Sequence, residues 1–276
     1  MSLPEEPLIK IRPTRAWSFG DFREIWAHRE LFYFLVWRDL KVRYRQTLLG
    51  ALWVVLQPLL MTLVFVVFLG MIAKVSSPGI PYPLFLYSAL LPWTFFSNSV
   101  ASSSFSLVAS AHMITKVYFP RSLVPAAMVT VRLSDFLIAF LILVGLIIYY
   151  GVHPTWALLL VPVLIAHLTV LAIGVGLSLA AVNVQYRDVG TITPVMLQLW
   201  MFVSPIVYPA STVPARWRWA YDLNPLAGVI ENFRASLLGL PLNLKSLLVS
   251  AIITTLILCY SALIFHRLED EFADVI

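Results

Sequence analysis

Four cationic side chains in a short aromatic segment are the residues of this chain best suited to bind a ligand. Arg38, Lys41, Arg43 and Arg45 follow one another closely after Trp37. Arginine and lysine bind phosphate groups through charge-assisted hydrogen bonds, and cations beside a membrane attract anionic head groups. We therefore expect these four residues to hold a pyrophosphate or an anionic lipid. Lipid anchoring that only fixes the topology explains each cation equally well.

The spacing of the aromatic residues predicts the element that positions these cations. Tyr33, Trp37, Leu40 and Tyr44 are 4, 3 and 4 residues apart, so a helix would present them on one face and the cations on another. We predict an amphipathic helix over residues 27–49 that lies in a membrane interface, with its aromatic side in the acyl boundary. A basic helix that is merely solvated is the alternative.

The composition of the chain indicates an integral membrane protein. Of its 276 residues, 60% are hydrophobic and 12% are charged, whereas an ordinary soluble domain has about 25% charged residues. A helix needs about 20 apolar residues to cross a hydrocarbon core of about 30 Å. We predict an all-α membrane domain over residues 50–265 with six spans. The predicted spans are residues 50–73, 84–111, 133–150, 156–181, 191–208 and 247–265.

The distribution of basic residues predicts which side of the membrane each end occupies. Most of the 19 Lys and Arg residues fall in the N-terminal segment and in the other segments on its side of the membrane. By the positive-inside tendency, a lead over residues 1–26 and a tail over residues 266–276 are both expected in the cytoplasm. The lead has no apolar core, so no cleaved signal peptide is expected. The net charge of +5 comes mainly from residues before Gly50, so no nucleic-acid partner is expected.

Two polar features lie within or beside the predicted spans. Serines in the second span favour close packing of this helix on another helix, and lining of a polar conduit is the alternative. These serines are Ser97, Ser99, Ser102, Ser103, Ser104 and Ser106. Asp135 follows Arg132 by one helical turn, which predicts a structural ion pair at the membrane edge. A proton relay through Asp135 is the alternative.

The chain lacks the motifs of several enzyme classes. It has no phosphate-binding loop of the form G-x-x-x-x-G-K-[ST], no H-E-x-x-H and no G-x-S-x-G. Its single cysteine, Cys259, excludes an intramolecular disulfide and a thiolate metal site. Asp135 is the only carboxylate near a membrane interior, which disfavours an ion-coupled carrier. We expect no catalytic residue, cofactor or metal in this chain, but a passive conduit driven from outside it.

A short helix is predicted on the far side of the membrane, between the fifth and sixth spans. Asn224 is a good N-cap, Pro225 suits the first helical position, and Gly239 ends the segment. The segment contains charged residues, so we predict an amphipathic or re-entrant helix rather than a span. Its apolar face includes Val229, Ile230 and Phe233.

Four motifs in order resemble those of a known family. The first motif is Tyr44–Trp53 together with Gln57–Leu59 after it. The other three are Gln185–Val189, Ser204–Tyr208 and Asn224–Leu226. Together with the six-span plan they resemble the ABC-2 type permeases that export polysaccharides, and cover residues 30 to 265. The sequence is most similar to permeases for O-antigen-type polysaccharides, with capsule and teichoic-acid exporters next.

The resemblance implies partners that the chain itself does not contain. It implies a homodimer in the bacterial inner membrane, joined to a separate ATPase subunit that binds ATP and Mg. A polysaccharide linked to undecaprenyl pyrophosphate would pass outward through a channel at the dimer interface. Membrane lipids would contact the chain throughout.

The resemblance also suggests roles for three sets of residues. Aromatic faces stack on sugar rings, so channel-wall candidates are Trp53, Phe65, Phe68, Trp200, Phe202 and Tyr208, although packing explains most membrane aromatics. The candidates for coupling to the ATPase are His112, Lys116, Gln185, Tyr186, Arg187 and Asp188, where a generic cytoplasmic turn is the alternative. The candidates for an outer gate are Asn224, Pro225, Val229, Ile230 and Phe233, where a lid that only shapes the loop is the alternative.

Three rival functions stay open at this point. An ABC-2 permease for a drug or small lipid would have less aromatic channel walls. A membrane enzyme acting on lipid-linked sugars is disfavoured because no acid, base or metal constellation is present. A gated channel or scaffold would not depend on a nucleotide-binding partner.

Overall fold

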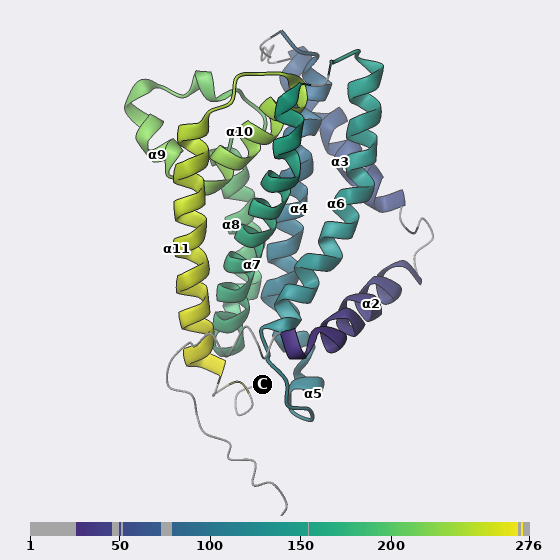
Figure 1. The fold of residues 1–276 in the computed structure, drawn as a ribbon, viewed down its shortest axis with the longest axis vertical. Coiled ribbons are helices and arrows are strands. Elements are labelled where there is room, and N and C mark those ends of the chain that lie inside the picture. Colours follow the sequence, from purple (N-terminus) through teal and green to yellow (C-terminus); the bar gives the residue numbers. More distant parts are fainter. Residues whose placement is uncertain are drawn as a thin grey trace, which may run out of the picture.

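The computed structural model describes residues 26–45, 50, 52–72, 79–153, 155–269 and 272. Within these ranges every regular element is a helix (Figure 1). The main helices are α2 (Arg29–Arg45), α3 (Leu52–Phe65), the π-helix η1 (Val66–Ile72), α4 (Tyr82–Ala109), α5 (Ala111–Ile114), α6 (Leu123–Tyr149), the 3-10 helix η2 (Trp156–Leu160), α7 (Val161–Gln185), α8 (Asp188–Val203), α9 (Arg218–Asp222), α10 (Pro225–Leu238) and α11 (Leu244–Glu269). Two short 3-10 turns, Ala210–Thr212 and Ala215–Trp217, precede α9.

The long helices form one bundle around α4. Helix α4 packs against α3, α6, α7, α8 and α10, while α11 packs against α7 and α10. Helix α2 lies obliquely across the lower part of α6 in Figure 1, and α5 lies at the same end of the bundle. Helices α9 and α10 lie at the opposite end. The predicted all-α fold is therefore confirmed for the part of the chain that the structure describes.

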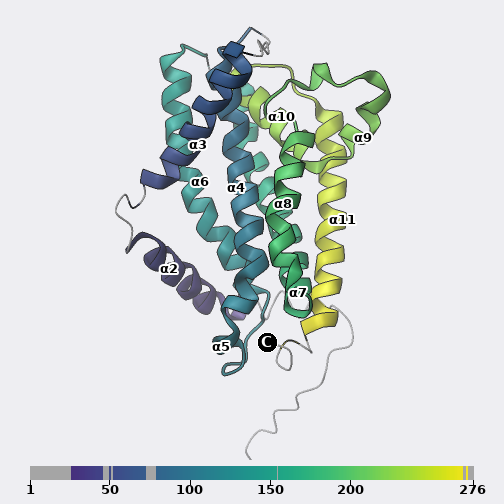
Figure 2. The ribbon, with the colours of Figure 1, turned by 180° about the vertical axis from the view of Figure 1, so that it is seen from behind.

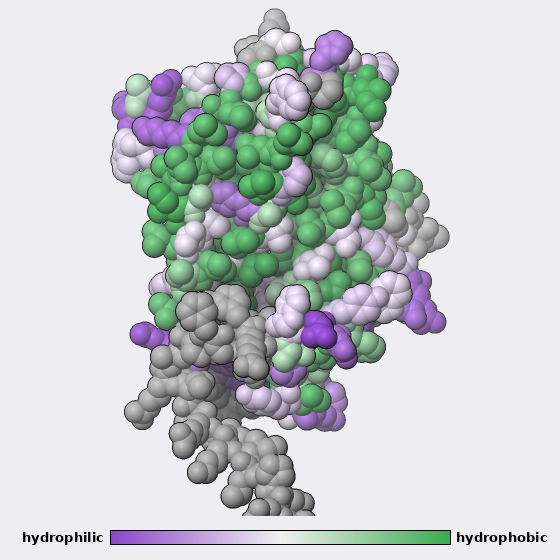
Figure 3. Space-filling model, viewed as in Figure 1, coloured by the Kyte–Doolittle hydropathy of each residue, from purple (hydrophilic) through white to green (hydrophobic). Residues whose placement is uncertain are grey.

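Four helical segments are long and apolar enough to cross a membrane. They are α3 with η1 (Leu52–Ile72), α6 (Leu123–Tyr149), η2 with α7 (Trp156–Gln185) and α11 (Leu244–Glu269). The other two predicted spans correspond to α4, which is long but rich in hydroxyl residues, and to α8, which has 16 residues. Apolar side chains cover most of the middle of the face in Figure 3, and hydrophilic ones gather over α2 and α9.

Two connections are shorter in the structure than the predicted spans imply, because the helices extend beyond those spans. The third span was expected from residue 133, but α6 begins at Leu123, because Pro125 falls in the first turn, where a helix needs no N–H from it. Arg132 and Asp135 therefore lie well inside α6. Between the fourth and fifth predicted spans, α7 continues to Gln185 and α8 begins at Asp188, so only Tyr186 and Arg187 lie between the two helices.

The predicted N-terminal helix is confirmed as α2, although residues 1–25 and 46–49 lie outside the described residues. Parts of the Tyr44–Trp53 motif and of the predicted tail also lie outside the described residues. Leu35 is 1% exposed and anchors α2 in a cluster with Ile114 and Phe119, near the start of α6. Tyr33 and Trp37 are exposed, with their rings stacked 6.5 Å apart. The interfacial position of α2 stays a prediction.

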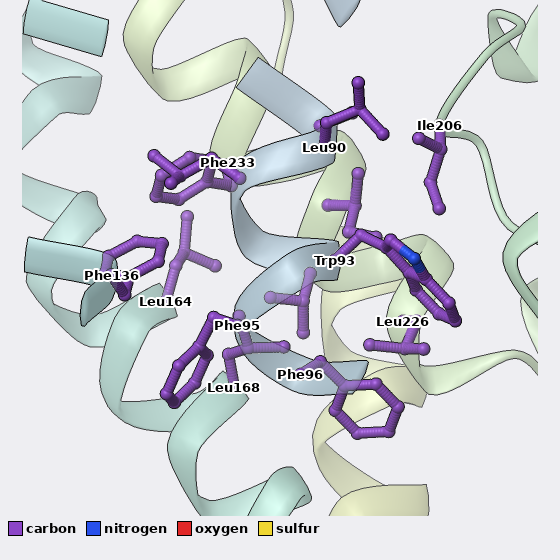
Figure 4. Close-up of a cluster of buried hydrophobic side chains, with 14 of the residues drawn as sticks. Leu90, Trp93, Phe95, Phe96, Phe136, Leu164, Leu168, Ile206, Leu226 and Phe233 are labelled. Carbon is purple, nitrogen blue, oxygen red and sulfur yellow. The ribbon is translucent and has the colours of Figure 1, made fainter. Parts of the chain in front are cut away.

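The main core surrounds α4 and joins it to α6, α7, α8 and α10. Figure 4 shows its aromatic centre, where Phe95 of α4 faces Phe136 of α6. Their ring centroids are 5.5 Å apart, and Phe233 of α10 packs 6.1 Å from Phe136. Aromatic pairs at these distances stabilise a core beyond the area that they bury. The core thus fixes α10 to the same rigid centre as the long helices.

Candidate functional site

A charged network joins α2 to α6 and α4. Asp135 forms ion pairs with Arg43 at 2.9 Å and with Arg132 at 3.6 Å, and it accepts a hydrogen bond from the hydroxyl of Tyr44. Arg132 in turn donates from Nε and Nη2 to Ser102 Oγ of α4, at 2.9 and 2.5 Å. Burial, together with the bond to Asp135, raises the pKa of the Tyr44 phenol to about 12. The predicted pair of Arg132 and Asp135 is confirmed. Arg43 of α2 lies nearer to Asp135 than Arg132 does.

This network separates the four predicted head-group cations into different environments. Arg43 points into the protein and pairs with Asp135. Arg38 pairs with its neighbour Asp39 at 2.8 Å. Lys41 and Arg45 are exposed on α2 and have no ion pair with a described residue. Only these two are free to meet a ligand at the surface.

A cavity of about 310 Å³ opens beside the network, between α2, α3, α4 and α6. Arg43, Arg132 and Asp135 form its charged side. Trp53, one of the predicted channel residues, and Asn98 of α4 also line it. The cavity is partly open and has mixed polar and apolar walls, and it lies at the level where α2 meets the long helices.

The six predicted channel-wall residues are not equally available. Trp53, Phe68 and Phe202 are 51%, 58% and 54% exposed, so their rings are accessible. Trp200 has a structural role, because its Nε1 donates to Asn224 Oδ1 at 2.9 Å and its ring meets Phe96 edge-on. The remaining two, Phe65 and Tyr208, are half-buried. The helices that carry the exposed rings, α3 with η1 and α8, flank α4 in Figure 2.

The two predicted coupling segments lie at the same end of the bundle (Figure 1). In the first, His112 and Lys116 are exposed, with 3.0 Å between His112 Nε2 and Lys116 Nζ. In the second, the turn between α7 and α8 exposes Tyr186, Arg187 and Asp188, and Gln185 precedes it, half-buried, at the end of α7. Both segments therefore present polar side chains where a partner can reach them.

Asn183 lies near the end of α7 and fixes the turn between α7 and α8. Its Nδ2 donates to the Ser104 carbonyl of α4, and its Oδ1 accepts from the Gly190 amide, both at 2.8 Å. A Cβ on Gly190 would lie 2.4 Å from the Phe105 ring, so α8 starts in close contact with α4. The turn is therefore attached to α4 by both a hydrogen bond and close packing.

The caps of the predicted outer helix are confirmed in α10. Asn224 Oδ1 accepts from the Leu226 amide at 3.1 Å, Pro225 starts the helix, and Gly239 ends it with a left-handed φ of 67°. Asn224 also donates to Ser204 Oγ at 2.9 Å. The same side chain therefore caps α10 and holds the end of α8.

Helix α10 is buried on nearly all sides, including Val229, Ile230 and Phe233, rather than on one face alone. The prediction of an amphipathic or re-entrant helix stays a prediction. Arg234 of this helix, 3% exposed, donates from Nη2 to the carbonyls of Pro205 at 2.8 Å and Ile206 at 3.1 Å.

The Arg234 guanidinium also lies 3.7 Å from the centre of the Phe85 ring. Carbonyl bonds and a cation–π contact compensate for the buried charge, and sequence alone does not display these partners. Burial lowers the pKa of Arg234 to about 10, so the group stays charged at neutral pH. Arg234 thus fixes the backbone of the Ser204–Tyr208 motif.

Metal ligands are not grouped in the part of the chain that the structure describes: no three His, Cys, Asp or Glu side chains lie together there. The residues that sequence reasoning missed are amides and guanidiniums with partners far along the chain. Asn183 and Arg234 belong to this class. A polar residue inside an apolar run was the only available signal.

The family model for the ABC-2 type transporter matches residues 30–238, from α2 through α10. The chain belongs to the ABC-2 type transporter family. This ABC-2 protein is 32% identical to "O-antigen export system permease protein RfbA" of Myxococcus xanthus, over 92% of this chain and 98% of that protein.

Two more relatives of this ABC-2 protein have related names. An "O-antigen export system permease protein RfbA" of Klebsiella pneumoniae is 28% identical, over 87% of this chain and 92% of that protein. "Polysialic acid transport protein KpsM" of Escherichia coli is 26% identical, over 85% of this chain and 91% of that protein. The predicted family resemblance is confirmed.

Proposed function

We propose that this chain is the membrane subunit of an ABC transporter that exports a polysaccharide of the O-antigen type. The observation that carries the proposal is the similarity to an O-antigen export permease over nearly the whole length of both proteins. The cargo would be a glycan linked to undecaprenyl pyrophosphate, moved outward across a bacterial inner membrane. Both ends of the chain would face the cytoplasm.

The conduit would form along α4, between α3 and α8. A partly exposed stripe of small and polar residues on α4 supports this path, as do the exposed rings of Phe68 and Phe202 on either side. The stripe consists of Thr94, Ser97, Asn98, Ala101 and Ser102. One chain supplies only half of a wall, so a homodimer would close the channel. In this arrangement α4 and α8 complete six spans, because a helix that lines a polar conduit need not be apolar all round.

The serines of α4 divide between packing and this conduit. Four of them are buried, as predicted for close packing: Ser99, Ser103, Ser104 and Ser106. The other two, Ser97 and Ser102, are partly exposed and belong to the stripe that would line the conduit. Phe202 would stack on passing sugar rings through its exposed face. At the far end, α9 and α10 would act as the outer gate, pinned to α8 through Asn224.

Energy would come from an ATPase subunit that binds ATP and Mg. It would press on α5 and on the turn that carries Tyr186, Arg187 and Asp188, since both lie exposed at one end. Short, rigid turns transmit rigid-body movement into the helices that they join. The exposed cations Lys41 and Arg45 would meet head groups at the same surface.

The test compares the double variant Arg187→Ala with Asp188→Ala against wild type, in a complex with the ATPase subunit. We expect the complex to assemble, while ATP turnover proceeds without export of glycan to the cell surface. The control is Lys245→Ala, which removes an exposed cation at the opposite end, outside the proposed gate, and should leave export unchanged. Export without nucleotide, or a chain that never associates with an ATPase, would refute the proposal.

A further inference from the structure

We propose that α11 links the first coupling segment, residues 110–122 between α4 and α6, to α10 at the other end of the bundle. Arg121, Glu269 and Phe272 form the latch that attaches α11 to this segment. The inference rests on the proposed function and deepens it, because the ATPase would press on the same segment. The three latch residues are positioning residues, since they hold the segment without touching nucleotide or glycan.

The latch joins two parts of the chain that are 148 residues apart in sequence. Arg121 lies two residues before α6, and its amide donates to Glu269 Oε1 at 3.1 Å. Its guanidinium Nη1 donates to the backbone carbonyl of Glu269, the last residue of α11. The last carbonyls of a helix have no acceptor role within the helix itself, so this bond satisfies one of them. The coupling segment is therefore attached to the end of α11 by two hydrogen bonds.

Phe272 holds the latch together by packing. Its side chain is 0% exposed, and its ring meets the Phe265 ring of α11 edge-on, with the ring centroids 5.4 Å apart. The Arg121 guanidinium lies 5.9 Å from the centre of the Phe272 ring. Phe272 also belongs to the same buried cluster as Phe119 of the coupling segment. Burial of a whole aromatic ring stabilises this arrangement beyond what the two hydrogen bonds supply.

The opposite end of α11 is attached to α10. A Cβ on Gly228 of α10 would lie 2.5 Å from the Ser246 backbone oxygen of α11, so the two helices are in close contact there. Asn232 of α10 donates from Nδ2 to the Asn243 carbonyl at 3.0 Å, and its Oδ1 accepts from the Asn243 amide at 2.9 Å. Asn243 directly precedes α11. Both ends of α11 are thus fixed by backbone contacts to the element that they would move.

Helix α11 is continuous between its two attachments. It runs over Leu244–Glu269, 26 residues without a Pro or Gly, and is about 39 Å long. In Figures 1 and 2 it extends from the end that carries α5 to the end that carries α10. Proline and glycine are common causes of kinks in helices. Helices α3, α4, α6, α7 and α8 each contain such a residue: Pro58, Pro92, Gly145, Gly174 and Pro194. Helix α11 is therefore suited to move as one body.

Helix α11 also packs along α7, which ends at the second coupling segment. Ser261 Oγ of α11 donates to the Gly174 carbonyl of α7 at 2.6 Å, so the two helices are held closely together. The latch thus attaches the first coupling segment to the pair of helices that carries the second. Movement at either segment would reach α10 through this pair.

The first test measures hydrogen exchange in the chain alone, in detergent micelles. We expect Phe272→Ala and Glu269→Ala each to speed exchange in the peptide that contains Arg121 about fivefold, because each removes part of the latch. Arg267→Ala changes an exposed residue in the last turn of α11 and should leave this exchange unchanged. Phe272→Leu keeps an apolar side chain and should restore most of the protection.

The second test measures the glycan exported per ATP hydrolysed, in a complex with the ATPase subunit. The two latch variants should assemble the complex and lower this ratio about fivefold, with Phe272→Leu close to wild type. Leu256→Gly with Tyr260→Gly loosens the middle of α11 and should lower the ratio as well. Leu256→Ala with Tyr260→Ala removes the same side chains, 63% and 62% exposed, and should leave it unchanged.

Three results would overturn the link. One is unchanged exchange near Arg121 in both latch variants, even where the Arg187 and Asp188 variant loses export as the proposed function requires. Another is an equal ratio for the glycine and alanine pairs in α11. The third is a loss of export that only follows a loss of assembled complex, which would leave the latch a purely structural role. Export without nucleotide would instead refute the proposed function, and the exchange test would still decide whether the latch exists.

Discussion

The two ends of the bundle each bury a charged group, but they compensate for it differently. At the lower end, Asp135 meets the side chains of Arg43, Arg132 and Tyr44. At the far end, Arg234 is held by two backbone carbonyls and the ring of Phe85, and no ion pair joins it to a carboxylate among the described residues.

Side chains change rotamers easily, whereas backbone carbonyls move only with their segment. The lower site is therefore an adjustable joint between α2 and the bundle, and the far site is a fixed clamp. A transporter driven from one end needs movement at that end, so the difference agrees with the proposed direction of drive.

The largest effect should come from breaking the clamp. Arg234→Met removes the donor to the Pro205 and Ile206 carbonyls and leaves them buried without a partner. We expect a loss of about 2–4 kcal/mol in the free energy of unfolding. Unfolding by sodium dodecyl sulfate in mixed micelles measures it. Arg218→Met, an exposed change at the same end, is the control, and an equal effect in both variants would contradict the clamp.

Two glycine substitutions compare the rigidity of the two ends directly. A Cβ on Gly228 would lie 2.5 Å from the Ser246 backbone oxygen, whereas a Cβ on Gly190 would meet the Phe105 side chain at 2.4 Å. A ring can turn away and a backbone cannot, so Gly228→Ala should cost about 2–3 kcal/mol and Gly190→Ala about 1–2 kcal/mol.

Thermal unfolding of the two glycine variants in the same detergent measures these costs. Gly145→Ala, which meets nothing within 4 Å, should be neutral or slightly stabilising. Phe105→Leu should rescue Gly190→Ala, and failure of that rescue would remove the side-chain explanation.

A smaller effect should come from the lower joint. Asp135→Asn keeps one acceptor oxygen, replaces the other by a donor NH2 and loses the attraction to Arg43, so we expect a loss of about 1–2 kcal/mol in the free energy of unfolding. A double-mutant cycle with Arg43→Gln should give a coupling energy of about 1 kcal/mol. The same cycle between Asp39→Asn and Lys41→Gln should give none, because Lys41 has no ion pair with a described residue.

The smallest effect should be a pH dependence of that joint. The folded protein raises the pKa of Tyr44 to about 12, above its usual value of 10.0. As pH rises past 10, the unfolded chain loses this proton first, so the folded state loses stability progressively up to about pH 12. Comparison of wild type with Tyr44→Phe across this range isolates the effect. Parallel stability curves for the two proteins would argue against the bond to Asp135.

Local features of the sequence predicted local structure well. The helix at α2, the caps at Asn224 and Gly239, and the pair of Arg132 with Asp135 all depend on neighbours within a few residues. The start of α6, ten residues before the predicted third span, was harder to predict, because a proline is tolerated in the first turn of a helix and Pro125 falls there.

Pairings between distant residues were beyond such reasoning. Arg43 reaches Asp135, and Arg234 reaches the Pro205 carbonyl, only because tertiary packing brings separate helices together. The burial of α10 follows from the same packing. From the sequence, its charged residues indicated a helix with one exposed face. The cavity beside α2 likewise needs four elements to exist at once.

The π-helix η1 at the end of α3 has a consequence for how this chain can vary. Residues Val66–Ile72 form wider turns than an α-helix, so this stretch holds extra residues for its length. Deleting one residue there would tighten the turns to ordinary α-helical pitch, and the register of the preceding helix would stay intact. A deletion in the middle of α4 would instead rotate every following side chain out of the core. The chain therefore has a built-in place to tolerate single-residue length changes, next to Phe68.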